Sequence, residues 1–445
     1  MFMFPRLTSR FLFVLLFLVP VIPAWSQMVE EDNGLVASGL DSVLASAEQA
    51  SAGGGRLRQP ASGAPGLEDS ALGFVLFPDL KFDLIGSTSY IFDSNTTQSP
   101  IANSTSVFAF GLAAIAKSGD EKNRGAYYSL DYNGQAFLYT DSADDCGRDP
   151  YEHYFSGLVG VNGGKTRLRL DVDYHRNNGN SIQWDNIQRE TRRAASHDYN
   201  FTLSGSRDLH RGDLLFSTGY ALRDFDPGTG FGDGENTFGD LSYMTTPSFA
   251  PKSTVGLGVR FGSDDYDGQS SQDYTTPSLR WGYRLSGKTS IHNSLGYEFR
   301  SIDAPGSVES ENVVYNGSIN WAATSKTGFA LNYYRNVLPS YVLTGEDSTN
   351  TGISLQMQND LPGLFALTSR IGYENAEYFA GSAGASSDRD DNFARLSLEL
   401  THPLVITERI HGQWAIFYNY NQNDSNQAAF EFEQSITGIR FSLLY

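Results

Sequence analysis

The stretch STVGLGVRFGS, residues 253–263, decides the fold class, because its apolar residues stand at every second position. From Val255 to Phe261 the apolar side chains would point to one face of an extended chain, whereas glycines and Arg260 would point to the other. A period of two is the side-chain period of a β-strand. One apolar and one polar face suit a sheet that lies between two different environments.

The same alternation extends from this stretch in both directions, beginning near Lys81 and continuing to Tyr445. It recurs in about 18 segments of roughly 10 to 15 residues, near the length that a tilted strand needs to cross a bilayer. The segments lie near residues 82–92, 105–117, 124–140, 151–161, 165–176, 195–206, 213–223, 236–247, 252–263, 272–284, 288–300, 311–323, 327–338, 347–360, 364–378, 390–401, 408–421 and 429–445. We therefore predict an all-β fold, a transmembrane antiparallel up-and-down β-barrel of about 18 strands (roughly 16–20) of the bacterial outer-membrane type.

The connections between these segments alternate in kind. Short ones such as Gly287-Lys288-Thr289 carry turn residues, and the long ones, which include Asp264–Asp273 and Ser301–Glu311, are as a set acidic and rich in Gly, Asn and Asp. A secreted β-sandwich or β-helix would also alternate, but it has no reason to sort its loops this way. Gly282–Thr289 formally matches a phosphate-binding loop, yet a strand and not a helix should follow it, so we predict a hairpin turn.

The N-terminal residues 1–26 have the pattern of a secretory signal peptide, with two arginines before an apolar core and a cleavage site between Ser26 and Gln27. A membrane-anchoring helix is the alternative, but Pro20 and Pro23 interrupt the apolar stretch too early. The predicted organisation is a signal peptide at 1–26, a flexible N-terminal periplasmic leader at 27–80 and a barrel at 81–445.

The C-terminal strand carries an independent signal. Apolar residues stand at every second position up to an aromatic last residue, namely Ile439, Phe441, Leu443 and Tyr445. Such an ending resembles the signal by which bacterial outer-membrane barrels are assembled. It predicts the barrel-assembly machinery as a partner.

Composition excludes several function classes. The formal net charge of −19, from 32 Lys and Arg against 51 Asp and Glu, argues against a nucleic-acid partner. The single Cys146 excludes a multi-thiolate metal site. His175 could form a metal triad with Asp171 and Asp173, but a polar stripe facing the lumen is favoured. No set of Ser, His and carboxylate residues stands out, so we expect no enzyme activity and no cofactor.

We expect the polar face to line an aqueous lumen that passes small solutes or glycan. The pore-lining candidates are Arg167, Arg169, Asp171, Asp173, Arg260, Glu298, Arg300, Arg395, Glu399 and Arg440, each of which could equally stand in a structural ion pair. Acidic residues such as Asp264, Asp265 and Asp267 should form an anionic mouth that favours cations weakly. The alternative is a non-conducting structural or adhesin-like barrel whose long acidic loops bind a partner.

Short motifs resemble the β-barrel porin family 2, over about residues 77–445. They are Phe77-Pro78-Asp79-Leu80, Tyr90-Ile91-Phe92-Asp93-Ser94-Asn95, Ala250-Pro251-Lys252-Ser253-Thr254 and Leu285-Ser286-Gly287-Lys288-Thr289. The resemblance implies a porin in the Gram-negative outer membrane, with lipid and lipopolysaccharide around it, and a link to exopolysaccharide export and its components. It brings no catalytic residues and leaves the solute and the oligomeric state open.

Overall fold

The computed structural model describes residues 80–444, apart from 97, 99, 141–149, 180–194, 228–231, 268–270, 304–307, 340–345, 381–387 and 408–409. The predicted cleavage site at Ser26 and Gln27, the leader except its last residue, Cys146 and Tyr445 lie outside the described residues. Within them, no helix is both long enough and apolar enough to cross a membrane.

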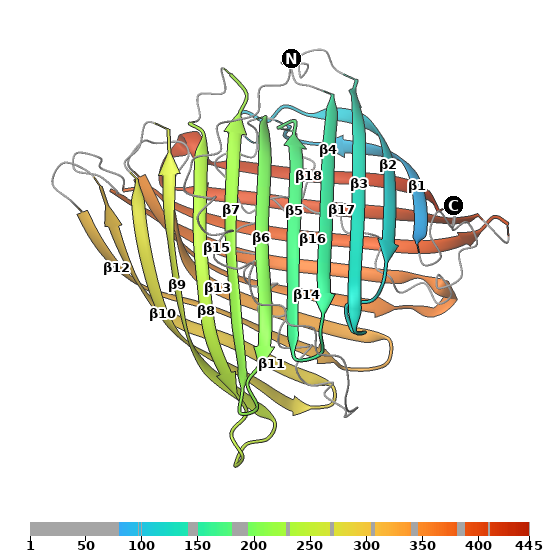
Figure 1. Cartoon of the computed structure of the whole chain (residues 1–445). Coiled ribbons are helices and arrows are strands. Elements are labelled where there is room, and N and C mark those ends of the chain that lie inside the picture. The colour runs from blue at the N-terminus through green and yellow to red at the C-terminus, as the bar shows by residue number, and fades with distance from the viewer. Residues whose placement is uncertain are drawn as a thin grey trace, which may run out of the picture. The chain divides into compact units, whose positions relative to one another are not determined.

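Eighteen strands make up the described chain, each antiparallel to the next (Figure 1). They are β1 (Lys81–Asp93), β2 (Thr105–Ser118), β3 (Gly125–Tyr139), β4 (Tyr151–Asn162), β5 (Thr166–Asn177), β6 (Ser196–Asp208), β7 (Asp213–Phe225), β8 (Gly234–Thr245), β9 (Ser253–Tyr266), β10 (Gln272–Ser286), β11 (Thr289–Ile302), β12 (Val308–Ala322), β13 (Thr327–Pro339), β14 (Glu346–Asp360), β15 (Ala366–Ala380), β16 (Asp390–Val405), β17 (His411–Ser425) and β18 (Phe432–Leu444). Two 3₁₀ turns, η3 (Pro362–Leu364) and η4 (Ala428–Phe430), lie in connections.

The sheet closes on itself, because β1 pairs with β18 as well as with β2. The closing ladder runs from Ile85 opposite Leu444 to Asp93 opposite Ile436. The predicted fold class and strand number are thus confirmed, and each predicted segment corresponds to one strand. In Figure 1 the strands β3–β8 of the near wall cross those of the far wall, β14–β18, at a wide angle, as the tilt of strands in a closed barrel requires.

The two rims of the barrel differ less than predicted. The connections that follow odd-numbered strands lie at one rim, called here the long-loop rim, and include residues 178–195. However, the loops predicted at Asp264–Asp273 and Ser301–Glu311 shrink to 267–271 and 303–307. The reason is that polar residues continue the ladders beyond the apolar part of the strands, with Asp264 opposite Gln272.

The opposite rim, called the short-turn rim, contains the predicted hairpin turns. β10 ends at Ser286 and β11 begins at Thr289, so the match to a phosphate-binding loop is a β-hairpin and no helix follows it. In the turn from β4 to β5, Gly164 has a φ of +86°, a conformation that favours glycine.

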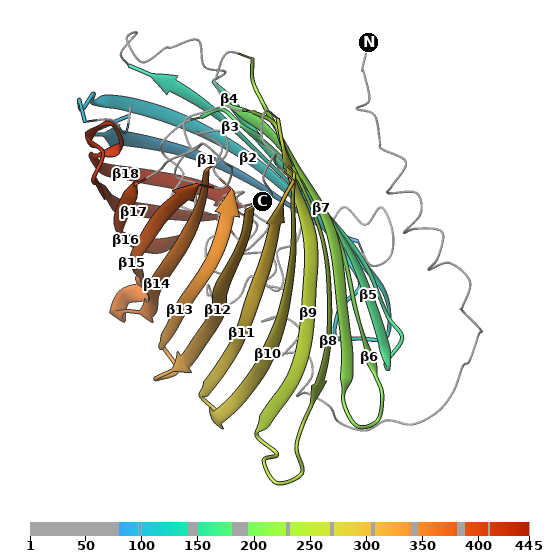
Figure 2. The same ribbon diagram turned by 90° about the vertical axis from the view of Figure 1, so that its left-hand side faces the viewer.

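Apolar side chains cover the outer surface of the barrel, whose strands are seen from a second side in Figure 2. Leu257 is 70% exposed, and Phe110, Val159 and Ile371 are also exposed. Among the described residues, one small hydrophobic cluster is buried together, formed by Ile91, Val107, Ala109, Phe137 and Ile436. A protein with so much exposed apolar surface needs lipid around it.

The fold generates a prediction about orientation. An even number of strands places both ends of the barrel at the short-turn rim, and in outer-membrane barrels short turns face the periplasm. An epitope inserted after Pro227, at the long-loop rim, should bind antibody on intact cells. The same epitope after Gly287 should bind only after the outer membrane is permeabilised, and antibody binding to Gly287 insertions on intact cells would refute this orientation.

Candidate functional site

The candidate site is the face of the sheet that lies opposite the exposed apolar side chains. In β5, Leu168 and Leu170 are exposed on the outer surface, so Arg169 between them points the other way. In β18, Ile439 is exposed on the outer surface, so the next residue, Arg440, points inward. By this alternation all ten pore-lining candidates share the inner face.

Charged side chains on the inner face stand mainly in ion pairs. Arg169 contacts Asp171 at 2.7 Å and approaches Glu121 at 3.9 Å. Arg440 pairs with Glu399 at 2.9 Å, which joins β18 to β16 across the intervening strand. These pairs leave the inner wall polar without one dominant sign of charge.

Three further candidates have partners of various kinds. Arg395 pairs with Glu374 on β15 at 3.3 Å. Asp173 accepts a hydrogen bond of 2.9 Å from the Tyr154 hydroxyl. The Arg260 guanidinium lies 4.2 Å from the ring centre of Phe238 in a cation–π contact.

A buried group near the long-loop rim, called here the Arg300 cluster, consists of Arg300, Glu298, Asp264, Gln272 and Asp347. Arg300 contacts Glu298 at 3.0 Å and Asp264 at 2.7 Å, and it also donates to the Gln272 side-chain oxygen at 2.8 Å. The Gln272 amide in turn donates to Asp347 at 2.9 Å. Asp264 was predicted to belong to an anionic mouth, and this prediction is wrong, because the residue is 3% exposed and already paired.

The inner face is packed at one end and more open at the other. The Arg300 side chain near the long-loop rim is 2% exposed, whereas that of Arg440, nearer the short-turn rim, is 26% exposed. On other strands near the same rim, three more polar residues are fully buried, namely Asp93, Asp391 and Gln434. Charged side chains of the inner face are therefore more deeply buried in the Arg300 cluster than at Arg440.

Sequence reasoning missed the partners that lie on other strands. Arg223 of β7 contacts Asp198 of β6 at 2.6 Å, and Arg280 of β10 contacts Asp240 of β8 at 2.6 Å. Such pairs can be proposed from sequence only once the register is known, because opposite charges must lie at the same depth on nearby strands. A register derived from the turn positions would have supplied that signal.

The metal triad considered for His175 does not form. His175 contacts Glu152 at 2.6 Å, while Asp171 pairs with Arg169 and Asp173 with Tyr154. Among the described residues, no group of three or more His, Cys, Asp or Glu side chains is arranged to hold a metal ion.

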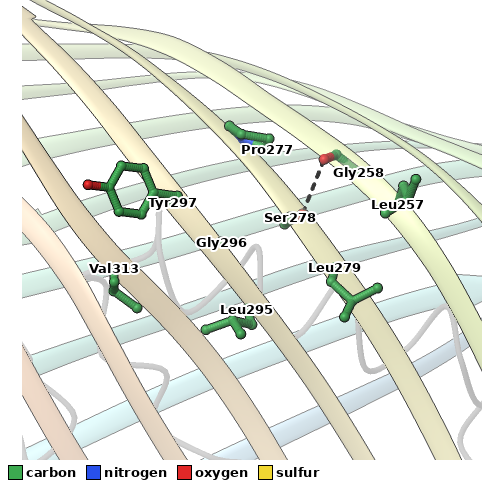
Figure 3. Close-up of a pocket in the computed structure, with 9 residues that line it drawn as sticks. All are labelled: Leu257, Gly258, Pro277, Ser278, Leu279, Leu295, Gly296, Tyr297 and Val313. Carbon is green, nitrogen blue, oxygen red and sulfur yellow. Dashed lines mark hydrogen bonds between the residues drawn. The ribbon is translucent and has the colours of Figure 1, made fainter.

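A groove of about 490 Å³ marks the outer surface (Figure 3). Its walls include Leu257, Leu279 and Val313, and Pro277 stands in the middle of β10. Since proline has no N–H, the ladder between β10 and β11 skips this position. The groove contains no charged side chain and forms part of the apolar surface.

The predicted C-terminal signal lies on the same apolar surface. Ile439 and Leu443 are exposed there, and Phe441 lies opposite Trp414 of β17. Tyr445 is outside the described residues. The role of these residues in assembly stays a prediction.

Comparison with known proteins gives only remote likenesses. No family model and no curated protein matches the chain, so the resemblance to the β-barrel porin family 2 rests on the motifs alone. Among solved structures, OccAB3 of Acinetobacter baumannii has 10% identity and a TM-score of 0.45, covering 83% of this chain and 100% of its own. OccK2 (OpdF) of Pseudomonas aeruginosa, in complex with glucuronate, has 12% identity and a TM-score of 0.43, covering 82% and 97%. The outer membrane protein OpdK of Pseudomonas aeruginosa has 12% identity and a TM-score of 0.42, covering 82% and 98%.

The unequal burial of the ion pairs predicts unequal effects on stability. Replacing Arg300 with methionine leaves the buried carboxylates of Asp264 and Glu298 without their cation, which typically costs about 3 to 5 kcal/mol. The matched change Arg440→Met removes a pair whose side chains are 26% and 28% exposed and which is worth about 1 kcal/mol or less. Urea unfolding of the purified barrel in detergent, followed by heat-modifiable migration, compares the two. Equal midpoints for both variants would show that the Arg300 cluster does not stabilise the barrel.

Proposed function

We propose that the protein is a channel of the Gram-negative outer membrane that passes small hydrophilic solutes. The observation that carries this proposal is one closed 18-stranded barrel with apolar side chains outside and charged side chains inside. Barrels of this strand number usually enclose an aqueous interior. Water and solutes would move along the inner face, past the pore-lining candidates.

The packing at the long-loop rim supports small solutes over large ones. The residues of the Arg300 cluster are all 7% exposed or less, so a solute would have to pass beside these buried residues. Paired charges such as Arg169 and Asp171 would replace part of the hydration shell of a polar solute without binding the solute strongly. Passage of a glycan chain, with polysaccharide-export components as partners, is a finer proposal that has only the motif resemblance in its support.

The same packing favours one second candidate, a non-conducting barrel that serves as a structural or adhesin-like element. In that case the buried rim would seal the lumen. A lumen filled by loop 177–194 would favour this second candidate, and residues 180–194 of that loop lie outside the described residues. For either function we propose that acidic side chains at the long-loop rim, such as Asp265 and Asp390, contact lipopolysaccharide through divalent cations.

The proposed channel should be weakly cation-selective. Exposed carboxylates at the long-loop rim, namely Asp265, Asp267, Asp388 and Asp390, concentrate cations at the mouth. This effect should fade towards 1 M salt, where the Debye length is about 3 Å. Replacing these four aspartates with asparagine should reduce the preference, as measured by reversal potentials across a salt gradient in planar bilayers.

Two outcomes would contradict this account. Bilayers that stay silent with correctly folded protein would favour the structural barrel. Clear anion preference would instead mean that arginines such as Arg167, rather than the acidic rim, control permeation.

A further inference from the structure

All seven lysines of the chain lie at the short-turn rim. Four of them stand directly before a strand, and the other three belong to the start of β1, the end of β2 and the turn from β2 to β3. They are Lys165, Lys252, Lys288 and Lys326 before β5, β9, β11 and β13, followed by Lys81, Lys117 and Lys122. The exposed aspartates of the long-loop rim therefore have no lysine near them.

The four lysines that precede strands occupy equivalent positions. The backbone carbonyl of each accepts a hydrogen bond of 2.8 Å from an N–H near the end of the next even-numbered strand. The donors are Asp208, Arg284, Ala322 and Asp360, for Lys165, Lys252, Lys288 and Lys326 in that order. In each strand pair the ladder thus continues by one residue to include the lysine. The Lys288 N–H also donates to the Ser286 hydroxyl, and the Lys326 N–H to the Thr324 hydroxyl, both at 3.1 Å.

Alternation places these lysines on the inner face of the barrel. Trp321, the residue before the partner of Lys288, is exposed on the outer surface. Tyr283, the residue before the partner of Lys252, is exposed there too. Because neighbouring residues of a strand point to opposite faces, both lysines lie on the inner face, at the mouth of the barrel interior.

The lysine side chains have no partner within the described part of the chain. All seven are exposed, and none of their ammonium groups forms a hydrogen bond or an ion pair with another described residue. Inner-face arginines such as Arg169 and Arg440 are instead paired with carboxylates. The lysines are therefore the cations that stay available to a ligand.

The positive charge is least balanced between β9 and β11. Acids opposite lysines are found elsewhere on the rim, namely Asp208 and Asp360. Lys252 and Lys288 have no acid opposite them, and Arg284 of β10 lies between them on the same face. We call Lys252, Arg284 and Lys288 the basic mouth.

The spacing of the basic mouth suits an anion with several charges. Neighbouring strands lie about 4.8 Å apart, so Lys252 and Lys288 begin roughly 10 Å from each other. Their flexible side chains can bring both ammonium groups to one ligand. A monovalent anion contacts one of them and is attracted weakly in water, whereas a multivalent anion gains from each cation that it reaches.

We propose that the basic mouth is a binding site for solutes that carry several negative charges within the span of two lysines. The proposal deepens the proposed channel function, because such solutes would enter the lumen from the short-turn side. Binding itself does not depend on conduction. The acidic long-loop rim and the basic mouth act at opposite ends of one lumen, which keeps the overall preference for cations weak.

Calorimetric titration of the purified barrel in detergent with tripolyphosphate tests the site. At about 0.1 M salt the anion should bind, and binding should fade towards 1 M salt, as the Debye length falls from about 10 Å to about 3 Å. Replacing Lys252 and Lys288 together with glutamine should raise the Kd by about tenfold, equivalent to about 1.4 kcal/mol.

The matched control is Arg124→Gln with Arg207→Gln. It removes two cations from the same rim, at positions that follow the outward alternation of β3 and β6. The control should bind tripolyphosphate as wild type does. An unchanged Kd in the lysine variant, or an equal loss in the control, would overturn the site.

Planar bilayers test the place of the site in the channel. Tripolyphosphate should reduce the current at a lower concentration from one side of the membrane than from the other, because only one mouth is basic. The lysine variant should lose this difference, and the control variant should keep it. Equal block of wild type from both sides would overturn the position of the site at one mouth. Calorimetric binding to a barrel that never conducts would support the anion site and contradict the channel function.

Discussion

Backbone hydrogen bonding in lipid is the constraint on which the rest of this structure depends. The hydrocarbon core offers no water to unpaired N–H and C=O groups, so a sheet can cross it only as a closed barrel. The pairing of β1 with β18 supplies that closure. Once the sheet is closed, strand alternation sends every second side chain to lipid and the others inward, which makes an apolar outside and a charged inside two results of one arrangement.

The closed wall also determines how charge is arranged within it. Side chains crowded on the inner face meet across strands, so Arg395 reaches Glu374 and Arg440 reaches Glu399. Charges buried near the long-loop rim need such partners more than those nearer the short-turn rim, because fewer waters reach them. Between β12 and β13 the described ladder ends at Tyr315 opposite Arg335, and Asp347 at the start of β14 contacts Gln272 of β10.

The period of two in the sequence was enough to predict eighteen strands, with the largest errors at the ends of β16 and β17, which run to Val405 and Ser425. Those ends are polar or interrupted by proline, so the alternation fades before the ladder does. The same period of two predicted that the pore-lining candidates share the polar face of the sheet. Partners on other strands did not follow from it, because Asp264 and Arg300 are brought together by register. The burial of Asp347 against Gln272 was also beyond prediction, since alternation does not reveal which residues of another strand cover a side chain.

The central claim is that one face of each strand meets lipid and the other meets water. It is tested most directly by single cysteines at positions 395 to 400 of β16, in a Cys146→Ser barrel reconstituted in liposomes and treated with a membrane-impermeant thiol reagent. The account predicts labelling at Arg395, Ser397 and Glu399 and protection at Leu396, Leu398 and Leu400. Equal labelling of neighbouring positions, or labelling of the leucine positions alone, would contradict it.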